Sequence, residues 1–183
     1  DDLVDEMVAT ARRMSAELGK LEDYGDEEKE KIYQQIGLAA LKYFILKVDP
    51  KKNMTFNPAE SIDFNGNTGP FIQYTYARIQ SVLKKAGEQN TDITGIQPIE
   101  KELDVIRLLY DFPEIIAQSA STYNPSYLAN YLYDLSKEFN QFYHDHSILS
   151  AESDLQVSYR LMLTRIAGDT IQKGMELLGI EVP

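Results

Sequence analysis

The sequence predicts an all-α fold, a helical bundle with a small irregular or extended segment before its central helix. Three observations favour this class. Apolar residues recur at the three- and four-residue spacing of amphipathic helices over most of the 183 residues. Prolines and glycines stand where such helices would begin or end. No apolar run approaches the roughly 20 residues that cross a bilayer, so no membrane partner is expected.

The first helical pattern begins at the start of the chain. Its apolar stripe consists of Leu3, Met7, Ala11, Met14 and Leu18. Gly19 can end this helix, and a charged segment follows it. A second helix is predicted from about Glu28 to Lys47. The Asp49-Pro50 pair ends it, because a residue before a proline leaves the helical region.

Residues 54–69 interrupt the helical pattern, because their few apolar side chains stand among Asn, Asp, Gly and Pro. This composition predicts an extended, weakly hairpin-like excursion and then a turn. Pro70 fits the first position of the next helix, with Thr68 or Gly69 as its cap. That helix should reach about Ala86, and Gly87 can end it.

Four more helices are predicted after a polar linker over residues 87–98. Pro98 opens one, and Asp111 caps a short one that starts near Pro113. Asn124 and Pro125 open the third, whose inward side chains are Leu128, Leu132, Leu135 and Phe139. The last helix runs from near Ser153 to Leu178, and Gly179 closes it.

The composition narrows the possible functions. A net charge of −11 argues against general nucleic-acid binding and against DNA as a partner. The charge is uneven, with four acids and three bases in residues 61–100 but twelve and six in residues 101–183. Local, stacking-driven RNA contact therefore stays possible. The absence of cysteine excludes disulfides and thiolate chemistry and fits a reducing, cytoplasmic compartment.

The helix after Pro70 carries two different faces. At about 100° per residue, one face holds the core stripe of Ile72, Tyr76, Ile79 and Leu83. The opposite face holds Tyr74, Arg78, Ser81 and Lys85, with Phe71 at its edge. Tyr rings and Arg planes stack well on unpaired bases, so this face is a candidate RNA-binding stripe. The alternative is that Tyr74 and Arg78 pack on a neighbouring helix and that Arg78 pairs with a carboxylate.

Other motifs give weaker evidence for a binding or catalytic site. The glycines of "GNTGP" could hold a phosphate at a helix N-terminus, but turn formation and capping explain them. In "YHDHS", His144 and His146 could bind a metal, but no further ligand is evident and no metal site is predicted. Tyr143 could face outward there or belong to the core. No catalytic residue is predicted, because no nucleophile elbow or comparable motif is present.

Three segments resemble the C-terminal part of arginyl-tRNA synthetases, which are class I enzymes. "MTFNPAESIDFNGNTGPFIQYTYARIQSVL" is similar to that family's approach to its anticodon-binding domain. "FPEIIAQSASTYNPSYLANYLYDLSKEFNQFY" and "YRLMLTRIAGDTIQKGMELLGIEVP" resemble the helices of the DALR anticodon-binding fold. The resemblance implies that residues 66–183 form this domain. Residues 1–65 then contain the end of the catalytic region, stem-contacting helices and the extended segment.

The resemblance also implies a function. The chain would bind the anticodon arm of arginine tRNA, as a monomer in the cytoplasm. The parent ligase would use ATP and Mg²⁺ to attach arginine to the tRNA. Neither ATP-binding signature of the family occurs in this sequence, so the chain is expected to be inactive alone and to hold no cofactor. The other function considered is a helical protein-protein interaction module that does not bind RNA.

Residue by residue, the resemblance implies anticodon-loop contacts for Phe71, Tyr74, Arg78 and Tyr143. Phe71 departs from the tyrosine that is common in the family, so stacking there is expected without a hydroxyl contact. Lys85 joins the predicted RNA-binding set through its place on the same helix face. Arg160 and Arg165 resemble positions of the DALR motif helix, where either RNA contact or helix anchoring is open.

Overall fold

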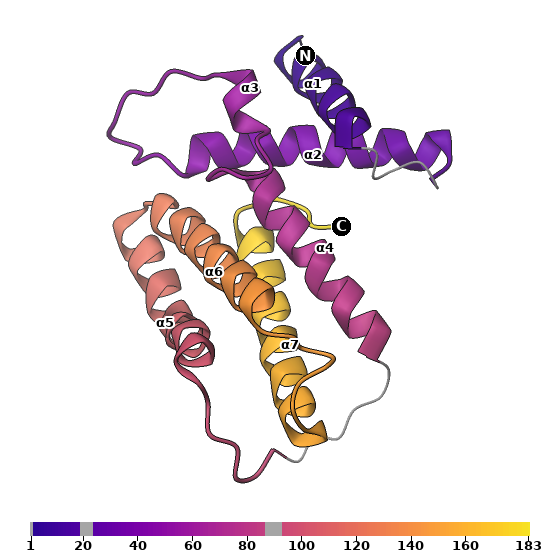
Figure 1. Ribbon diagram of the computed structural model, residues 1–183. Helices are drawn as coiled ribbons and strands as arrows, with labels where there is room; N and C mark the ends of the chain where they lie inside the picture. The colour runs from indigo at the N-terminus through magenta and orange to yellow at the C-terminus, as the bar shows by residue number, and fades with distance from the viewer. Residues whose placement is uncertain (1, 19–23, 87–92) are drawn as a thin grey trace.

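Every regular secondary-structure element is a helix in the part of the chain that its computed structural model describes, residues 2–18, 24–86 and 93–183. This confirms the predicted all-α class. The helices are α1 (Asp2–Leu18), α2 (Asp26–Leu46), α3 (Pro58–Ser61), α4 (Gly69–Ala86), α5 (Glu100–Thr122), α6 (Ser126–Asp145) and α7 (Asp154–Leu177), as Figure 1 shows.

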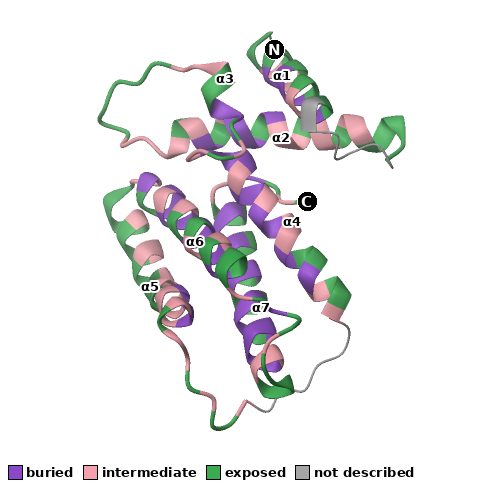
Figure 2. Cartoon of the chain, in the orientation of Figure 1, coloured by how far each residue is buried: buried purple, intermediate pink, exposed green. Residues whose placement is uncertain are grey.

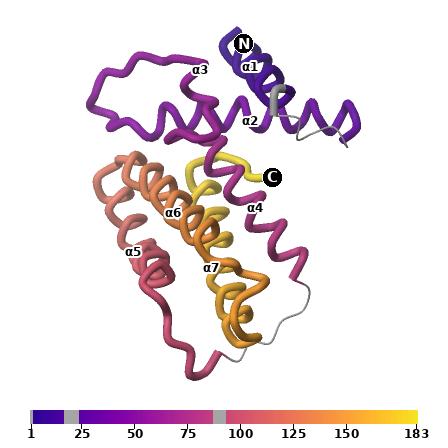
Figure 3. The backbone as a smooth tube through the Cα atoms, in the orientation of Figure 1, coloured from indigo at the N-terminus to yellow at the C-terminus, as the bar shows by residue number. Residues whose placement is uncertain are grey.

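The helices form two connected groups (Figures 1 and 3). Helices α1, α2 and α3 pack together, and α4 descends from them into a bundle with α5, α6 and α7. The C-terminal residues return to the junction between the groups. There the Lys42 ammonium donates to the Gly179 carbonyl at 2.5 Å, and the Gln73 amide donates to the Glu181 carbonyl at 2.8 Å. The tail therefore joins α2 to α4.

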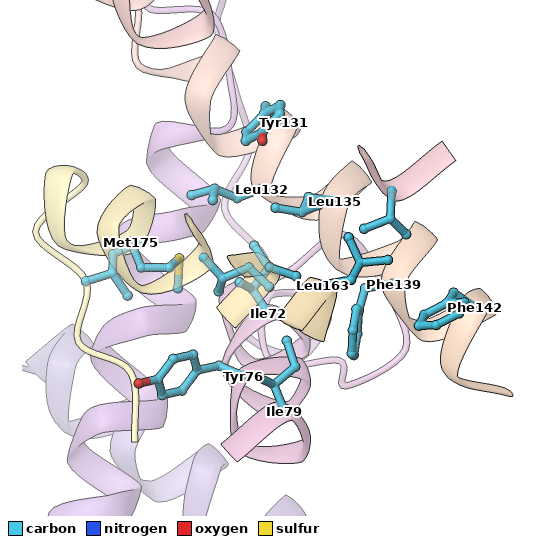
Figure 4. Packing of buried hydrophobic residues seen from close by; sticks show 14 of the residues in the cluster. Ile72, Tyr76, Ile79, Tyr131, Leu132, Leu135, Phe139, Phe142, Leu163 and Met175 are labelled. Atoms are coloured by element: carbon cyan, nitrogen blue, oxygen red, sulfur yellow. The ribbon is translucent and has the colours of Figure 1, made fainter. Parts of the chain in front are cut away.

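The main core lies inside the bundle, where the inward faces of α4, α6 and α7 are buried (Figures 2 and 4). The predicted inward residues of α6 are all buried, namely Leu128, Leu132, Leu135 and Phe139. On α4, the predicted residues Ile72, Tyr76 and Ile79 are buried as well, while Leu83 is half-buried against the core. A second, smaller cluster joins α1, α2 and the start of the 62–68 segment.

Local capping explains where the helices begin. The Thr68 hydroxyl accepts from the Phe71 backbone N–H at 3.2 Å, and Ser153 accepts from that of Gln156 at the same distance. Asn124 likewise accepts from the Ser126 N–H at 3.0 Å. Such caps satisfy backbone donors that the first helical turn leaves unpaired. These predicted starts are confirmed, while the proposed stop residues Gly19 and Gly87 lie outside the described ranges.

Helix α5 corrects the prediction of two separate helices. It is continuous from Glu100 to Thr122, with Pro113 in its interior. A proline there removes one backbone hydrogen bond and crowds the preceding turn. Packing outweighs that cost, because α5 continues to bury side chains on both sides of the proline. The Phe112 ring, for example, stacks on Tyr131 with 5.6 Å between centroids.

The segment before α4 also differs from the prediction. Instead of a hairpin-like excursion, it contains one helical turn, α3, which Asn57 caps by accepting from the Ala59 N–H at 3.1 Å. Ile62 follows it and is fully buried in the smaller cluster with Met7. Ile62 is the one large buried side chain of this mostly polar segment, so the sequence there shows no helical periodicity from which α3 could be predicted.

Helices α2 and α4 approach each other closely at Gly69. A Cβ atom at Gly69 would lie 2.5 Å from the Ala39 carbonyl oxygen and 3.0 Å from the Tyr43 Cβ. Burial raises the pKa of the Tyr43 hydroxyl, so this group stays protonated. The hydroxyl oxygen lies within hydrogen-bonding distance of two acceptors, the Asn67 side-chain oxygen at 2.6 Å and the Ala129 carbonyl at 2.9 Å. Together these contacts position the first turn of α4.

The Gly69→Ala substitution should lower the free energy of unfolding by about 1–3 kcal/mol, because the added methyl group meets backbone atoms that cannot move independently. Urea denaturation measures this change. The control is Gln80→Ala on the exposed side of α4, which should stay within about 0.5 kcal/mol of the original chain. Equal effects of the two substitutions would contradict the close approach.

The Pro113→Ala substitution should raise the free energy of unfolding by about 1–3 kcal/mol. The new N–H can donate to the Leu109 carbonyl, and the crowding of the ring disappears. Ala117→Gly, at an exposed position of the same helix, should lower the stability by about 1 kcal/mol. A loss of stability in Pro113→Ala, measured by urea denaturation, would show that α5 depends on the proline.

Candidate nucleic-acid interface

A groove of about 570 Å³ lies where α4 from Tyr74 to Lys85, the end of α6 and the segment after α6 meet. Its lining residues are Tyr74, Ala77, Arg78, Ser81, Val82, Lys85, Tyr143, Ser147, Ile148 and Leu149. Four of the five residues predicted to bind RNA, Tyr74, Arg78, Lys85 and Tyr143, therefore share one surface feature. The fifth, Phe71, does not line it.

Helical periodicity explains the α4 side of the groove. Tyr74, Arg78, Ser81 and Lys85 follow one another at spacings of four, three and four residues, which places them on one face of α4. On α6, Phe139 and Phe142 are fully buried, and Tyr143, the residue after Phe142, lies at the edge of the core. The Tyr143 ring stacks on that of Phe139, with 6.5 Å between centroids, and 38% of the residue is exposed. Tyr143 is thus anchored on one side and open on the other.

Arg78 lines the groove between the rings of Tyr74 and Tyr143. Its guanidinium carbon lies 4.8 Å from the Tyr74 ring centroid and 5.2 Å from that of Tyr143. One Nη1–H group donates to the Asn140 side-chain oxygen, and the Asn140 amide donates to the Thr75 hydroxyl at 2.7 Å. Cation–π contacts and this hydrogen bond hold the guanidinium plane in place.

The packing interpretation of the α4 stripe holds in part, while RNA binding by this stripe stays a prediction. Arg78 contacts the neighbouring helix α6, as the packing interpretation expected. Its partner is the Asn140 amide oxygen, however, and not a carboxylate as that interpretation had it. Ser81 and Lys85 are exposed, while Tyr74 and Arg78 are half-buried at the groove. The stripe is thus held by α6 on one side, while Ser81 and Lys85 are accessible on the other.

The charge of the groove differs from that of the whole chain. Its lining contains Arg78 and Lys85 but no carboxylate, in a chain of net charge −11. Two phenol rings, a guanidinium plane and an ammonium group suit an unpaired base with its phosphate. Because the charge is local, stacking and short-range hydrogen bonds would supply the attraction, with little long-range steering.

Phe71 lies elsewhere on α4. Its ring is half-buried, packs on the bundle core and contacts the Tyr133 ring with 5.4 Å between centroids. Phe71 precedes Tyr74 by almost one turn, which places it before the groove. The structure thus separates it from the other four predicted residues, and its contact with RNA stays a prediction.

Several residues that line the groove or support it from behind could not be identified from the sequence. Asn140 looks like any polar residue of an amphipathic helix, and only the packing of α6 on α4 brings it to Arg78. The wall formed by Ser147, Ile148 and Leu149 follows α6 in an irregular segment with no motif. The one feature of the sequence that could have indicated this wall is its position directly at and after the "YHDHS" motif that begins with Tyr143.

The remaining motifs have structural explanations or no site around them. Thr68 caps α4 and Asn67 accepts from Tyr43, so the "GNTGP" turn serves helix initiation. His144 lies 3.5 Å from the Asp145 carboxylate, and both are exposed. Among the described residues, no three His, Asp or Glu side chains gather as a metal site would require. None of the described helices is both long and apolar enough to cross a membrane.

Comparison with known proteins gives consistent matches. A profile of the DALR anticodon binding domain matches residues 72–183. The chain is 55% identical to the arginine–tRNA ligase of Parabacteroides distasonis and 54% identical to that of Flavobacterium psychrophilum. Both alignments cover the whole chain but only 32% and 30% of the relatives. The chain therefore spans about a third of the length of these relatives.

Solved structures agree with the sequence comparison. The arginyl-tRNA synthetase of Thermus thermophilus matches the whole chain with a TM-score of 0.91 and 33% identity, over 31% of its own length. That of Plasmodium falciparum matches with a TM-score of 0.83 and 25% identity, over 32% of its length. The resemblance noted in the sequence is confirmed: the fold agrees with these structures, the family profile covers well over half of the residues, and the chain belongs to the DALR anticodon-binding domain family.

Proposed function

We propose that this chain is the C-terminal, tRNA-binding part of an arginine–tRNA ligase and that it binds the anticodon arm of arginine tRNA. The observation that carries the proposal is the groove that joins Tyr74, Arg78 and Tyr143 on a locally basic surface of an acidic protein. The names of the similar ligases support arginine tRNA as the partner.

The proposal assigns a different role to each part of the ligase. Residues 66–183 bind the anticodon arm, while residues 1–65 form the end of the catalytic region and contact the tRNA stem. The rest of the ligase binds ATP and Mg²⁺ and attaches arginine, because the ATP-binding signatures are absent from this sequence. The complete ligase acts as a monomer in the cytoplasm.

Binding begins with an unpaired anticodon-loop base that stacks on Tyr74 or Tyr143. Arg78 contacts a base edge or phosphate through the N–H groups that its bond to Asn140 leaves available. Lys85 neutralises a neighbouring phosphate, and Phe71 stacks on a nucleotide at the edge of this surface. Because Asn140 and two rings already hold Arg78, little side-chain entropy is lost on binding.

The Tyr74→Ala/Arg78→Ala double substitution should weaken binding of arginine tRNA by more than about tenfold. Each stacked base contributes roughly 1–3 kcal/mol, and the double variant also loses the guanidinium. Equilibrium binding of arginine tRNA and of one non-cognate tRNA measures the loss of affinity and of cognate preference. Thermal melting should show a folded protein, since both side chains are only half-buried.

Arg107→Ala is the matched control for charge. This exposed α5 arginine pairs with Glu100 and Asp104 outside the groove, so its removal changes the net charge by the same unit as the loss of Arg78. It should leave tRNA affinity within about twofold, as expected for a rim charge far from the contact. Equal losses in both variants would contradict the groove. A folded original chain without tRNA affinity would favour the protein-interaction alternative.

The salt dependence of binding should be shallow. Few cations line the groove, so we expect roughly two to four phosphate contacts and a slope of log K against log salt of about −1.4 to −2.8. Titrations at several salt concentrations measure this slope. A steep slope like that of a strongly basic RNA-binding protein would show that other cations of the chain carry the binding.

A further inference from the structure

A buried ion pair lies behind the wall of the groove. Arg160 of α7 is only 7% exposed, and its Nε–H donates to Glu102 Oε1 at 2.7 Å. Glu102 is fully buried at the start of α5, and its second oxygen accepts from the Ile99 backbone N–H at 3.0 Å. The pair therefore ties the first turn of α5 to α7.

The same guanidinium also holds the segment that forms the groove wall. Its Nη1–H donates to the Ser147 carbonyl at 2.7 Å, and Ser147 begins the wall that continues through Ile148 and Leu149. The guanidinium carbon lies 5.9 Å from the ring centroid of Phe142, the residue before Tyr143. Arg160 thus contacts the last turn of α6 and the start of the α6–α7 connection without lining the groove.

The geometry requires a planar guanidinium. Two donors of one rigid fork reach acceptors on two different elements, Glu102 and Ser147, whereas a lysine ammonium is a single point charge. A buried ion pair is a weak source of stability, because desolvation offsets most of the Coulomb attraction. The effect of this arrangement is therefore expected in the placement of the wall more than in the free energy of folding.

We propose that Arg160 is a positioning residue for RNA binding. It sets the distance between the 147–149 wall and the Tyr74 and Arg78 face of α4, and so the fit of the groove to an unpaired nucleotide. This inference rests on the proposed function, and it assigns Arg160 the anchoring role and no contact with RNA.

The test uses a variant that removes the tie while preserving folding, Arg160→Met/Glu102→Met. Replacing both buried charges with apolar side chains of similar length leaves no unpaired charge and is often neutral for stability. The Ser147 carbonyl loses its donor. Arg160→Lys, which keeps the charge opposite Glu102 but lacks the fork, is the second variant. Tyr131→Phe is the control, because it loses the hydrogen bond from the buried Tyr131 of α6 to the Leu108 carbonyl of α5, and Tyr131 does not line the groove.

Two measurements are made on each full chain. Amide hydrogen exchange of Ile148 to Ser150 in the free protein reports on the wall, where the Ser150 N–H donates to the Ser147 hydroxyl at 3.1 Å. Equilibrium binding to an RNA stem-loop that carries an arginine anticodon reports on the groove. Both Arg160 variants should speed the exchange and raise the Kd roughly two- to thirtyfold, the range for residues that act without touching the ligand. Tyr131→Phe should change neither by more than about twofold.

Exchange and affinity unchanged in a folded double variant would overturn the inference, as would an equal loss of affinity in Tyr131→Phe at matched stability. If the double variant does not fold, Arg160→Lys decides by the same two measurements. Failure of the original chain to bind the RNA would overturn the proposed function itself. The exchange measurement needs no RNA, so it would still show whether Arg160 holds the wall.

Discussion

The close approach of α2 and α4 at Gly69 determines how α4 is presented. A glycine lies there because any Cβ atom would meet the Ala39 carbonyl within 2.5 Å. Once that contact and the Thr68 cap fix the first turn, the rotation of the whole helix follows from its 3.6-residue period. Ile72 then points into the core, and Tyr74 and Arg78 reach the groove on the other side of the same helix.

The groove gives an acidic protein a local surface that contains Arg78 and Lys85 but no carboxylate. Long-range electrostatic attraction is unavailable at a net charge of −11, and general binding to nucleic acids is correspondingly disfavoured. In the proposed binding of tRNA, short-range contacts would take the place of that attraction. Asn140 and two tyrosine rings hold the Arg78 guanidinium from one side, and Arg160 holds the opposite wall through Ser147. Polar groups at the base of the site thus supply rigidity, while rings and cations at its surface supply contacts.

The sequence alone determined the features that depend on neighbours within about four residues. Helix caps act locally through side-chain oxygens, so the starts of α4, α6 and α7 at Thr68, Asn124 and Ser153 could be predicted. Amphipathic periodicity acts over one or two turns, and it correctly separated the buried face of α4 from the face that carries Tyr74 and Arg78.

Only the tertiary structure decided which residues meet between helices. Propensity stops a helix at Pro113, but the packing of α5 on α6 carries it through the proline. Periodicity offers no partner for Arg78, and the packing of α6 on α4 supplies Asn140 in place of a carboxylate. The same packing brings Tyr143 to the groove and leaves Phe71 outside it. The contacts between α4 and α6 join residues about 60 or more positions apart. Their geometry depends on how whole helices pack, which no local pattern of side chains records.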